Sequence, residues 1–207
     1  MKGKFVTVEG GERVGKSTYI GMLREYLEER GLLESYVFTR EPGGGEIAER
    51  IRGIILDKSY FGKISYRTEA LLYAAARCQH IDGVILPALN AGKNVICDRY
   101  IHSSFAYQGY ARKLGAEYVT AINGYAVENC MPDAVIFIDL PPEKAYWREG
   151  GSEDRMENEK AEFHRAVYEG FKELQKSADN FFTVTPKDKN ETFGKILNLL
   201  KDTGFFL

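Results

Sequence analysis

Near the start of the chain stands Lys4-Phe5-Val6-Thr7-Val8-Glu9-Gly10-Gly11-Glu12-Arg13-Val14-Gly15-Lys16-Ser17-Thr18. A short apolar, β-branched run opens this stretch, a helical pattern follows it, and Gly10-x-x-x-x-Gly15-Lys16-Ser17 lies between them. Glycines let the backbone curl so that successive N–H groups face a polyphosphate, and the positive end of the next helix adds to the attraction. In such a loop the lysine reaches the β- and γ-phosphates and the serine hydroxyl binds Mg²⁺. We therefore predict a nucleoside triphosphate site over residues 10–18; the alternative is an ordinary glycine turn, which the flanking strand and helix disfavour.

The composition is that of a globular enzyme of one domain. The chain has 207 residues, of which 44% are hydrophobic and 28% charged, and its net charge is −2. This charge gives no electrostatic case for binding nucleic acid or a membrane surface. No apolar run approaches the roughly 20 residues of a membrane span, and no signal-peptide pattern opens the chain, so we expect a cytoplasmic protein. The three cysteines, Cys78, Cys97 and Cys130, show neither zinc-ligand nor disulfide spacing.

Apolar runs alternate with helical patterns along the whole chain. After the opening strand, strands are expected at 35–39, 94–97, 134–138 and 180–184. Helices are expected at 16–30, 46–56, 68–91, 103–108, 115–129, 142–147, 158–178 and 191–201. Continuous apolar strands alternating with helices indicate a parallel sheet covered on both faces. We predict an α/β fold with a doubly wound, five-stranded parallel sheet, in a single domain that spans residues 1–207.

Charged side chains follow the predicted strands, where ligands of such sheets bind. Residues 9–16 follow the first strand, Arg40 the second, Asp98 and Arg99 the third, and Asp139 the fourth. Clustered guanidinium groups suit the charges of a transferring phosphoryl group. A second phosphate-bearing substrate is therefore a better hypothesis than water alone. The alternative is that Arg40 and Arg99 are surface ion-pair residues.

The chain resembles a known family, the thymidylate kinases, which belong to the P-loop nucleoside monophosphate kinases. The motifs that carry the resemblance are Gly10 to Thr18, Thr39-Arg40-Glu41-Pro42-Gly43-Gly44, Glu69-Ala70-Leu71-Leu72-Tyr73-Ala74-Ala75-Ala76-Arg77, Asp98-Arg99-Tyr100, Ser103-Ser104-Phe105-Ala106-Tyr107-Gln108-Gly109 and Asp154-Arg155. The resemblance extends over nearly the whole chain. The resemblance implies ATP-dependent phosphorylation of dTMP to dTDP, with Mg²⁺ as cofactor, in a homodimer. The long helix at 68–91 has enough apolar positions to serve both a core and a partner.

The resemblance also implies roles for individual residues. The phosphate-binding loop would contribute Gly10, Gly11, Glu12, Arg13, Val14, Gly15, Lys16, Ser17 and Thr18 to ATP binding. Ser17 would bind the metal, and Asp98 would act on the metal shell or on the acceptor phosphate. The dTMP phosphate would be held by Arg40 and Arg99, with Arg52 nearby. The thymine base would stack on Tyr73 and hydrogen-bond to Arg77, Ser104 and Gln108. Tyr107 would crowd the 2′ position, and Glu12 would hold the 3′-hydroxyl. The family usually has Phe where this chain has Tyr73, and the phenol hydroxyl needs a partner.

Arg148-Glu149-Gly150-Gly151-Ser152-Glu153-Asp154-Arg155 is predicted to form a small lid, at about 148–156, over the ATP phosphates. A lid excludes water, which would otherwise take the phosphoryl group; the alternative is a plain solvated turn. Bacterial family members commonly have a small residue at the position of Arg13 and a longer lid with a further arginine, so this chain resembles the eukaryotic-type subgroup here. We therefore expect the catalytic set to be Lys16, Arg13, Asp98 and Arg148, with Arg148 and Arg155 also contacting ATP.

Two other functions remain as alternatives. One is a kinase for another nucleoside monophosphate, against which the set of Arg77, Ser104 and Gln108 argues. The other is a nucleotide-dependent switch protein, which would usually carry an Asn-Lys-x-Asp motif for the guanine base, and the chain has none.

Overall fold

A five-stranded, all-parallel sheet forms the centre of the structure, a computed structural model that describes residues 2–145, 154–176 and 179–206. The strands are β1 (Phe5–Glu9), β2 (Tyr36–Arg40), β3 (Asn94–Asp98), β4 (Ala134–Ile138) and β5 (Phe181–Val184). Their order is β2-β3-β1-β4-β5, so the chain fills one side of β1 first and then crosses to the other. The predicted doubly wound parallel fold is confirmed.

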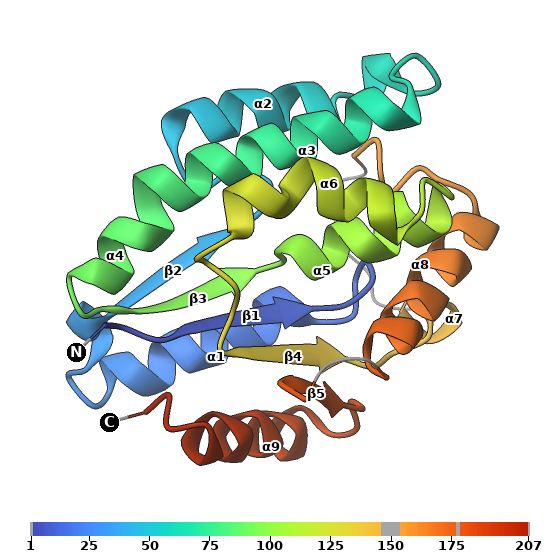
Figure 1. Cartoon of the computed structure of the whole chain (residues 1–207). Helices are drawn as coiled ribbons and strands as arrows, with labels where there is room; N and C mark the ends of the chain where they lie inside the picture. Colours follow the sequence, from blue (N-terminus) through green and yellow to red (C-terminus); the bar gives the residue numbers. More distant parts are fainter. Residues whose placement is uncertain (1, 146–153, 177–178, 207) are drawn as a thin grey trace.

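The described helices cover both faces of this sheet (Figure 1). The α-helices are α1 (Lys16–Glu28), α2 (Glu46–Leu56), α3 (Tyr66–His80), α4 (Leu86–Asn90), α5 (Ile101–Ser104), α6 (Ala116–Val127), α7 (Pro142–Ala145), α8 (Ala161–Leu174) and α9 (Lys189–Asp202). Short 3₁₀ segments are η1 (Leu33–Ser35) and η2 (Lys58–Tyr60), and π-helical segments are η3 (Ile81–Ile85) and η4 (Phe105–Ala111). No helix in the described part of the chain is both long and apolar enough to cross a membrane.

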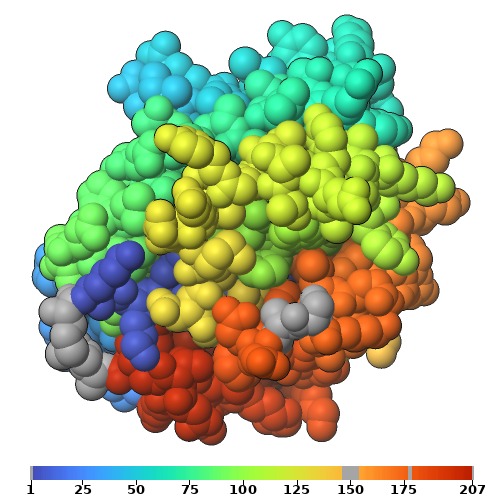
Figure 2. All heavy atoms as spheres, viewed as in Figure 1, coloured from blue at the N-terminus to red at the C-terminus, as the bar shows by residue number. Residues whose placement is uncertain are grey.

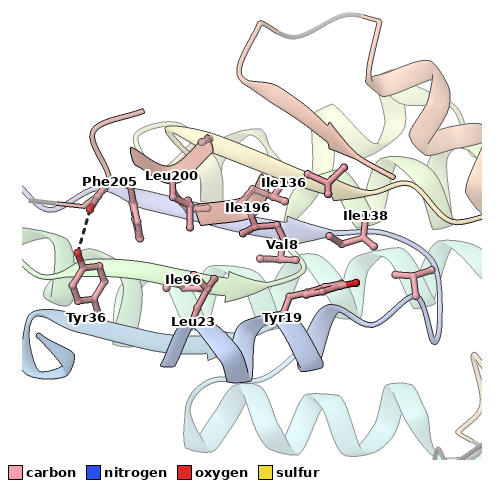
Figure 3. Packing of buried hydrophobic residues seen from close by; sticks show 14 of the residues in the cluster. Val8, Tyr19, Leu23, Tyr36, Ile96, Ile136, Ile138, Ile196, Leu200 and Phe205 are labelled. Atoms are coloured by element: carbon pink, nitrogen blue, oxygen red, sulfur yellow. Dashed lines mark hydrogen bonds between the residues drawn. The ribbon is translucent and has the colours of Figure 1, made fainter. Parts of the chain in front are cut away.

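The alternation of side chains along the strands builds a core on each face of the sheet. Val6 and Val8 of β1 pack with α1 and α9, whereas Phe5 packs with α4 and α6 on the opposite face. Figure 3 shows the first of these cores, where Leu23 of α1 and Leu200 of α9 meet the strands. Fully burying one such side chain stabilises the fold by about 1.5–3 kcal/mol. Both faces of the central strands β1, β3 and β4 are buried, whereas the edge strands β2 and β5 are only partly buried.

The helix predicted at 68–91 is continuous in space but not uniform. It passes from α3 through the π-helical segment η3 into α4. Pro87 occupies the first turn of α4 and has no N–H to donate to the preceding turn. A single wide π-turn is a common way for a helix to absorb such an interruption. A second π-helical segment, η4, extends the helix predicted at 103–108.

The two ends of the described chain lie side by side (Figure 2). Nζ of Lys4 donates to the carbonyl oxygen of Thr203 at 2.6 Å. Nδ2 of Asn94 and the hydroxyl of Tyr36 both donate to the carbonyl oxygen of Phe205, at 3.0 and 3.3 Å. The segment after α9 therefore closes the end of the sheet opposite to the strands' carboxyl ends, and it leaves those carboxyl ends open.

Candidate active site at the carboxyl ends of the strands

A cavity of about 530 Å³ opens where β1, β2 and β3 end. Sixteen of the predicted site residues line it: Glu12, Arg13, Val14, Gly15, Lys16, Ser17, Thr18, Arg40, Arg52, Tyr73, Arg77, Asp98, Arg99, Ser104, Tyr107 and Gln108. They come from segments up to 96 residues apart, between positions 12 and 108. The fold therefore brings the predicted triphosphate site and the predicted acceptor site to one cavity.

The loop after β1 has the backbone geometry of an anion-binding turn. Gly10 has φ +146°, and a Cβ there would lie 3.0 Å from the carbonyl oxygen of Ile138. Gly15 has φ +96° and precedes α1, whose first turn has no side-chain cap. The uncapped N–H groups of this turn remain available to an anion. Arg13 has φ +56°, a left-handed conformation that is costly for a residue with a Cβ.

Lys16 lies inside this loop and is held by the loop's own carbonyl groups. Its Nζ donates to Gly11 O at 2.6 Å and to Gly10 O at 3.3 Å. Burial, reinforced by the neighbouring charge of Arg99, lowers the pKa of Lys16 to about 8. The ammonium group is therefore still mostly charged near neutral pH, and a bound phosphate would favour the charged form further.

Glu12 and Arg99 form an ion pair in the wall of the cavity. Nη2 of Arg99 lies 2.8 Å from Oε1 of Glu12, which also accepts a hydrogen bond from the hydroxyl of Tyr107 at 2.7 Å. Burial alone would raise the pKa of Glu12, but Arg99 and Lys16 outweigh it and lower the pKa to about 2. Arg99 has φ +69° and donates through Nη1 to Gly10 O at 2.6 Å. The acceptor side of the cavity is therefore tied directly to the phosphate-binding loop.

A buried carboxylate, Glu9, supports the turn that carries Arg99. Its Oε1 accepts from the backbone N–H of Tyr100 at 2.7 Å, and its Oε2 accepts from the hydroxyl of Ser103 at 2.6 Å. The same hydroxyl accepts from Nη1 of Arg99 at 3.3 Å. Burial raises the pKa of Glu9 to about 7 although these hydrogen bonds oppose it. Glu9 thus helps to position Arg99 through the backbone of Tyr100 and the hydroxyl of Ser103.

Ser17 and Asp98 form an oxygen pair beside the loop. The hydroxyl of Ser17 donates to Oδ2 of Asp98 at 3.3 Å, while Oδ1 of Asp98 is buried with no hydrogen-bond partner in the structure. Mg²⁺ takes oxygen ligands and usually keeps several waters or phosphate oxygens, so one or two protein oxygens are enough. The orphaned carboxylate oxygen and the hydroxyl fit such an ion. The described residues contain no group of three or more His, Cys, Asp or Glu side chains that could hold a metal ion by themselves.

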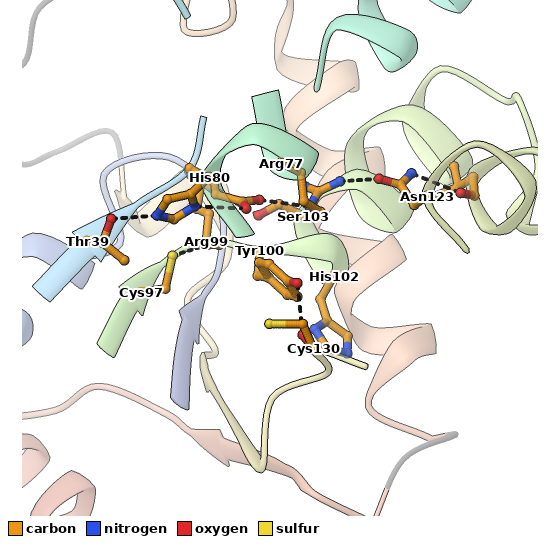
Figure 4. A network of polar contacts seen from close by, with 12 residues as sticks. Thr39, Arg77, His80, Cys97, Arg99, Tyr100, His102, Ser103, Asn123 and Cys130 are labelled. Carbon is orange, nitrogen blue, oxygen red and sulfur yellow. Dashed lines mark hydrogen bonds and ion pairs between the residues drawn. The ribbon is translucent and has the colours of Figure 1, made fainter. Parts of the chain in front are cut away.

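Arg77 is held by a chain of buried polar groups (Figure 4). Its Nε donates to Oε2 of Glu41 at 2.8 Å, and its Nη1 donates to Oδ1 of Asn123. Oε1 of Glu41 accepts from Nδ1 of His80 at 3.2 Å, and the other ring nitrogen of His80 lies 2.7 Å from the hydroxyl of Thr39. Because Arg77 also lines the cavity, its remaining corner, Nη2, is the part left for a ligand.

The two other predicted phosphate-binding arginines also have partners within the protein. Nη2 of Arg40 lies 2.9 Å from Oε2 of Glu49, and Nη1 of Arg52 donates to Pro42 O at 2.7 Å. Burial, together with the charge of Arg40, lowers the pKa of Arg52. Both arginines line the cavity, and the ion pair of Arg40 with Glu49 lies at the surface, where the two side chains are 50% and 39% exposed.

Three comparisons place the chain among known proteins. The family model described as thymidylate kinase matches residues 8–196. The chain is 47% identical over 178 residues to the thymidylate kinase of Oceanobacillus iheyensis, covering 84% of this chain and 78% of the relative. It is 44% identical over 200 residues to that of Finegoldia magna, covering 95% and 97%. The chain belongs to the thymidylate kinase family. The crystal structure of thymidylate kinase from Ehrlichia chaffeensis has a TM-score of 0.78 and 27% identity, covering 97% of this chain and 100% of that one.

Some predicted residues of this thymidylate kinase family member lie away from the cavity. Arg148 and most of the segment predicted as a lid fall outside the described residues. Arg155 is 3% exposed and binds Glu69 and the carbonyl oxygen of Ile55, and it does not line the cavity. Asp139 follows β4 as predicted, but it binds the hydroxyl of Tyr168 and Nζ of Lys172 instead of facing the cavity.

Other residues of the site have roles that the sequence did not predict. Glu157 lines the cavity, and its Oε2 lies 3.2 Å from Nη2 of Arg13. Glu41 orients Arg77, and Glu9 orients Arg99. For Glu9 the available signal was a carboxylate at the end of an apolar run, because a buried carboxylate requires partners; the polar surroundings of Glu41 and Glu157 in the sequence give no such signal. The sequence does not reveal which partners those are.

Proposed function

We propose that the chain transfers the γ-phosphoryl group of ATP to dTMP and so forms dTDP, as a step of dTTP biosynthesis. An oxygen of the dTMP phosphate forms the new bond to the γ-phosphorus, and the bond to the β–γ bridging oxygen breaks, which leaves ADP. The observation that carries this proposal is the shared cavity: the phosphate-binding loop and the clamped Arg77 line the same space. Such a transfer needs positioning and charge neutralisation more than covalent chemistry. No general base is required, because the acceptor phosphate is already ionised.

The donor nucleotide would bind along residues 10–18. The first turn of α1 offers uncapped N–H groups to the phosphates, and Lys16 exchanges its carbonyl partners Gly10 and Gly11 for phosphate oxygens. A magnesium ion would be held by Ser17 and Asp98, and it would neutralise charge on the β- and γ-phosphates when bound. Arg13 enters the cavity from the same loop, and we propose that it meets the charge of the moving γ-phosphoryl group.

The acceptor would bind in the other half of the cavity. Arg99, Arg40 and Arg52 supply the cationic surface for its phosphate. The base would bind against Tyr73, Arg77, Ser104 and Gln108, and the sugar would contact Glu12 and Tyr107. In the described arrangement Arg155 does not line the cavity, so the ATP contacts inferred for Arg155 and Arg148 stay predictions.

A coupled assay that follows ADP release tests the proposed reaction. ATP is supplied with dTMP, dUMP, dCMP or dGMP, and dTMP is expected to give the highest kcat/KM. Lys16→Met is the matched control, because it removes the ammonium group but keeps an unbranched side chain. Equal turnover of all four acceptors, or a higher rate with another nucleotide, would point instead to a different nucleoside monophosphate kinase. ATP binding without transfer to any acceptor would favour a switch protein.

We further propose that two copies of the chain form a dimer through the α2–α3 surface. Large apolar side chains are exposed there, with Ile47 50%, Ile54 47% and Leu71 51% accessible. Exposed apolar side chains that gather on adjacent helices are typical of an interface. The cytoplasmic location expected from the sequence also stays a prediction.

A further inference from the structure

Glu69 of α3 is a fully buried carboxylate surrounded by hydrogen-bond donors. Its Oε1 accepts from Nε2 of Gln108 at 3.1 Å and from Nε of Arg112 at 3.2 Å. Its Oε2 accepts from Nη2 of Arg112 at 3.1 Å and from Nη1 of Arg155 at 2.8 Å. Arg112 also pairs with Glu159. These five side chains are the Glu69 cluster, in which two carboxylates balance two arginines.

The cluster holds Glu69 in its ionised form. Burial by itself would raise the pKa of Glu69, but the hydrogen bonds and charge of Arg112 outweigh it and lower the pKa. An ionised carboxylate can only accept hydrogen bonds. The side-chain amide of Gln108 must therefore turn its nitrogen toward Glu69, whichever way the amide would otherwise lie. Since Gln108 is 1% exposed and lines the cavity, the amide oxygen is the group it can present to a ligand.

A fixed donor lies in the same half of the cavity. Glu41 and Asn123 hold Nε and Nη1 of Arg77, which leaves a guanidinium corner that can only donate. A donor and an acceptor of fixed polarity match the edge of thymine, where O4 accepts and N3–H donates. The edge of cytosine has the opposite pattern, with a donating N4 amino group and an accepting N3. A buried site rejects a ligand that leaves its polar groups unpaired far more strongly than one that merely fits loosely.

We propose that Glu69 is a positioning residue that sets base selectivity: it orients the amide of Gln108 so that the oxygen faces the base, and the cytosine edge is thereby rejected. This inference rests on the proposed dTMP phosphorylation. Glu69 itself does not touch the substrate, since Gln108 stands between it and the cavity.

Glu69→Gln is the direct test. A glutamine at this position can present either an oxygen or a nitrogen, so the amide of Gln108 becomes free to turn and to donate to N3 of cytosine. We expect the ratio of kcat/KM for dTMP to that for dCMP to fall at least tenfold, with KM for dTMP raised and KM for dCMP lowered. A purely structural role would lower both activities together and leave the ratio unchanged.

Glu69→Gln leaves an arginine without a balancing carboxylate in the interior, and this can prevent folding. A second variant is therefore needed. The double variant Glu69→Gln with Arg155→Gln removes one charge of each sign and keeps Arg112 paired with Glu159. Arg155→Gln alone is the control, because it keeps the carboxylate next to Gln108. The ratio of kcat/KM for dTMP to that for dCMP should stay within about twofold of the parent value, even if both values of kcat/KM fall.

Measurements on the parent protein separate the proposed reaction from the role of Glu69. Failure of the parent to phosphorylate dTMP would refute the proposed function. Normal dTMP activity in the parent, with an unchanged dTMP to dCMP ratio in the folded Glu69 variants, would overturn the role of Glu69 alone. A double variant that does not fold would assign Glu69 to stability only and would overturn the proposal as well.

Discussion

Replacing Arg13 with Gly separates catalysis from stability at one position. Arg13 has φ +56°, which glycine adopts without strain, so the substitution relieves about 1 kcal/mol of backbone cost. It also removes the ion pair with Glu157, whose side chains are 23% and 15% exposed, and such a partly screened pair is worth on the order of 1 kcal/mol. The two contributions oppose each other. The free energy of unfolding of Arg13→Gly should therefore stay within about 1 kcal/mol of the parent value.

Catalysis should respond very differently. If Arg13 meets the charge on the γ-phosphoryl oxygens, its removal lowers kcat by roughly a hundredfold or more, which corresponds to about 2.7 kcal/mol of transition-state stabilisation. KM for ATP should change little, because Lys16 and the first turn of α1 still hold the phosphates. Arg148→Ala is expected to cost less in kcat than Arg13→Gly.

The chain offers a matched control in Lys113, an exposed cation with φ +58°. Lys113→Gly makes the same change of backbone preference and charge away from the cavity. Steady-state kinetics and chemical denaturation are measured on both variants. A near-normal kcat in Arg13→Gly, equal to that of Lys113→Gly, would refute the catalytic role and leave Arg13 as a loop residue. A large loss of folding stability in Arg13→Gly would refute the reasoning about strain.

Three further predictions follow from the site and the surface. Tyr107→Ala should reduce the preference for dTMP over ribothymidylate at least tenfold in kcat/KM, whereas Tyr107→Phe, which keeps the ring, should retain it; similar turnover of both acceptors by the parent would contradict this role. Leu71→Glu should convert a dimer into a monomer in light scattering, and a parent that is already monomeric at micromolar concentration would contradict the interface. The pKa of Glu12 is lowered from 4.5 to about 2, so its ionisation stabilises the fold above pH 4.5 and this contribution is lost as the pH falls toward 2. The difference in unfolding free energy between the parent and Glu12→Gln should therefore shrink over that range in denaturation curves, and a constant difference would contradict the pairing with Arg99.

The sheet was predictable because its central strands are buried on both faces. Continuous apolar runs such as Ala134–Ile138 are visible without any knowledge of tertiary contacts. The π-helical segments were not visible, because their backbone pattern depends on how Pro87 and the neighbouring helices pack. The helix predicted at 158–178 is described as Ala161–Leu174, since ends of helices depend on local capping and less on apolar periodicity.

The phosphate-binding loop was predictable for a different reason: its turn is set by its own glycines, and Lys16 donates to Gly10 and Gly11 of the same loop. The supporting carboxylates were not, because their partners are distant in sequence. Glu157 lies 144 residues from Arg13, and Glu69 lies 86 residues from Arg155. A sequence shows that a carboxylate lies in an apolar helix face, as for Glu69, but it does not show which guanidinium groups fold against it.

The pairing of each cation in the cavity with a group of the protein bears on how the protein tolerates the charge of these cations. Arg13, Arg40, Arg99 and Lys16 would repel one another if they faced the cavity alone, but Glu157, Glu49, Glu12 and two loop carbonyl groups offset their charge. Nucleotide binding is then an exchange of partners, in which phosphate oxygens replace the carboxylate and carbonyl oxygens of the protein around these cations. Added salt weakens the resident pairs and the new ones alike, so substrate affinity should depend less steeply on ionic strength than the number of arginines suggests.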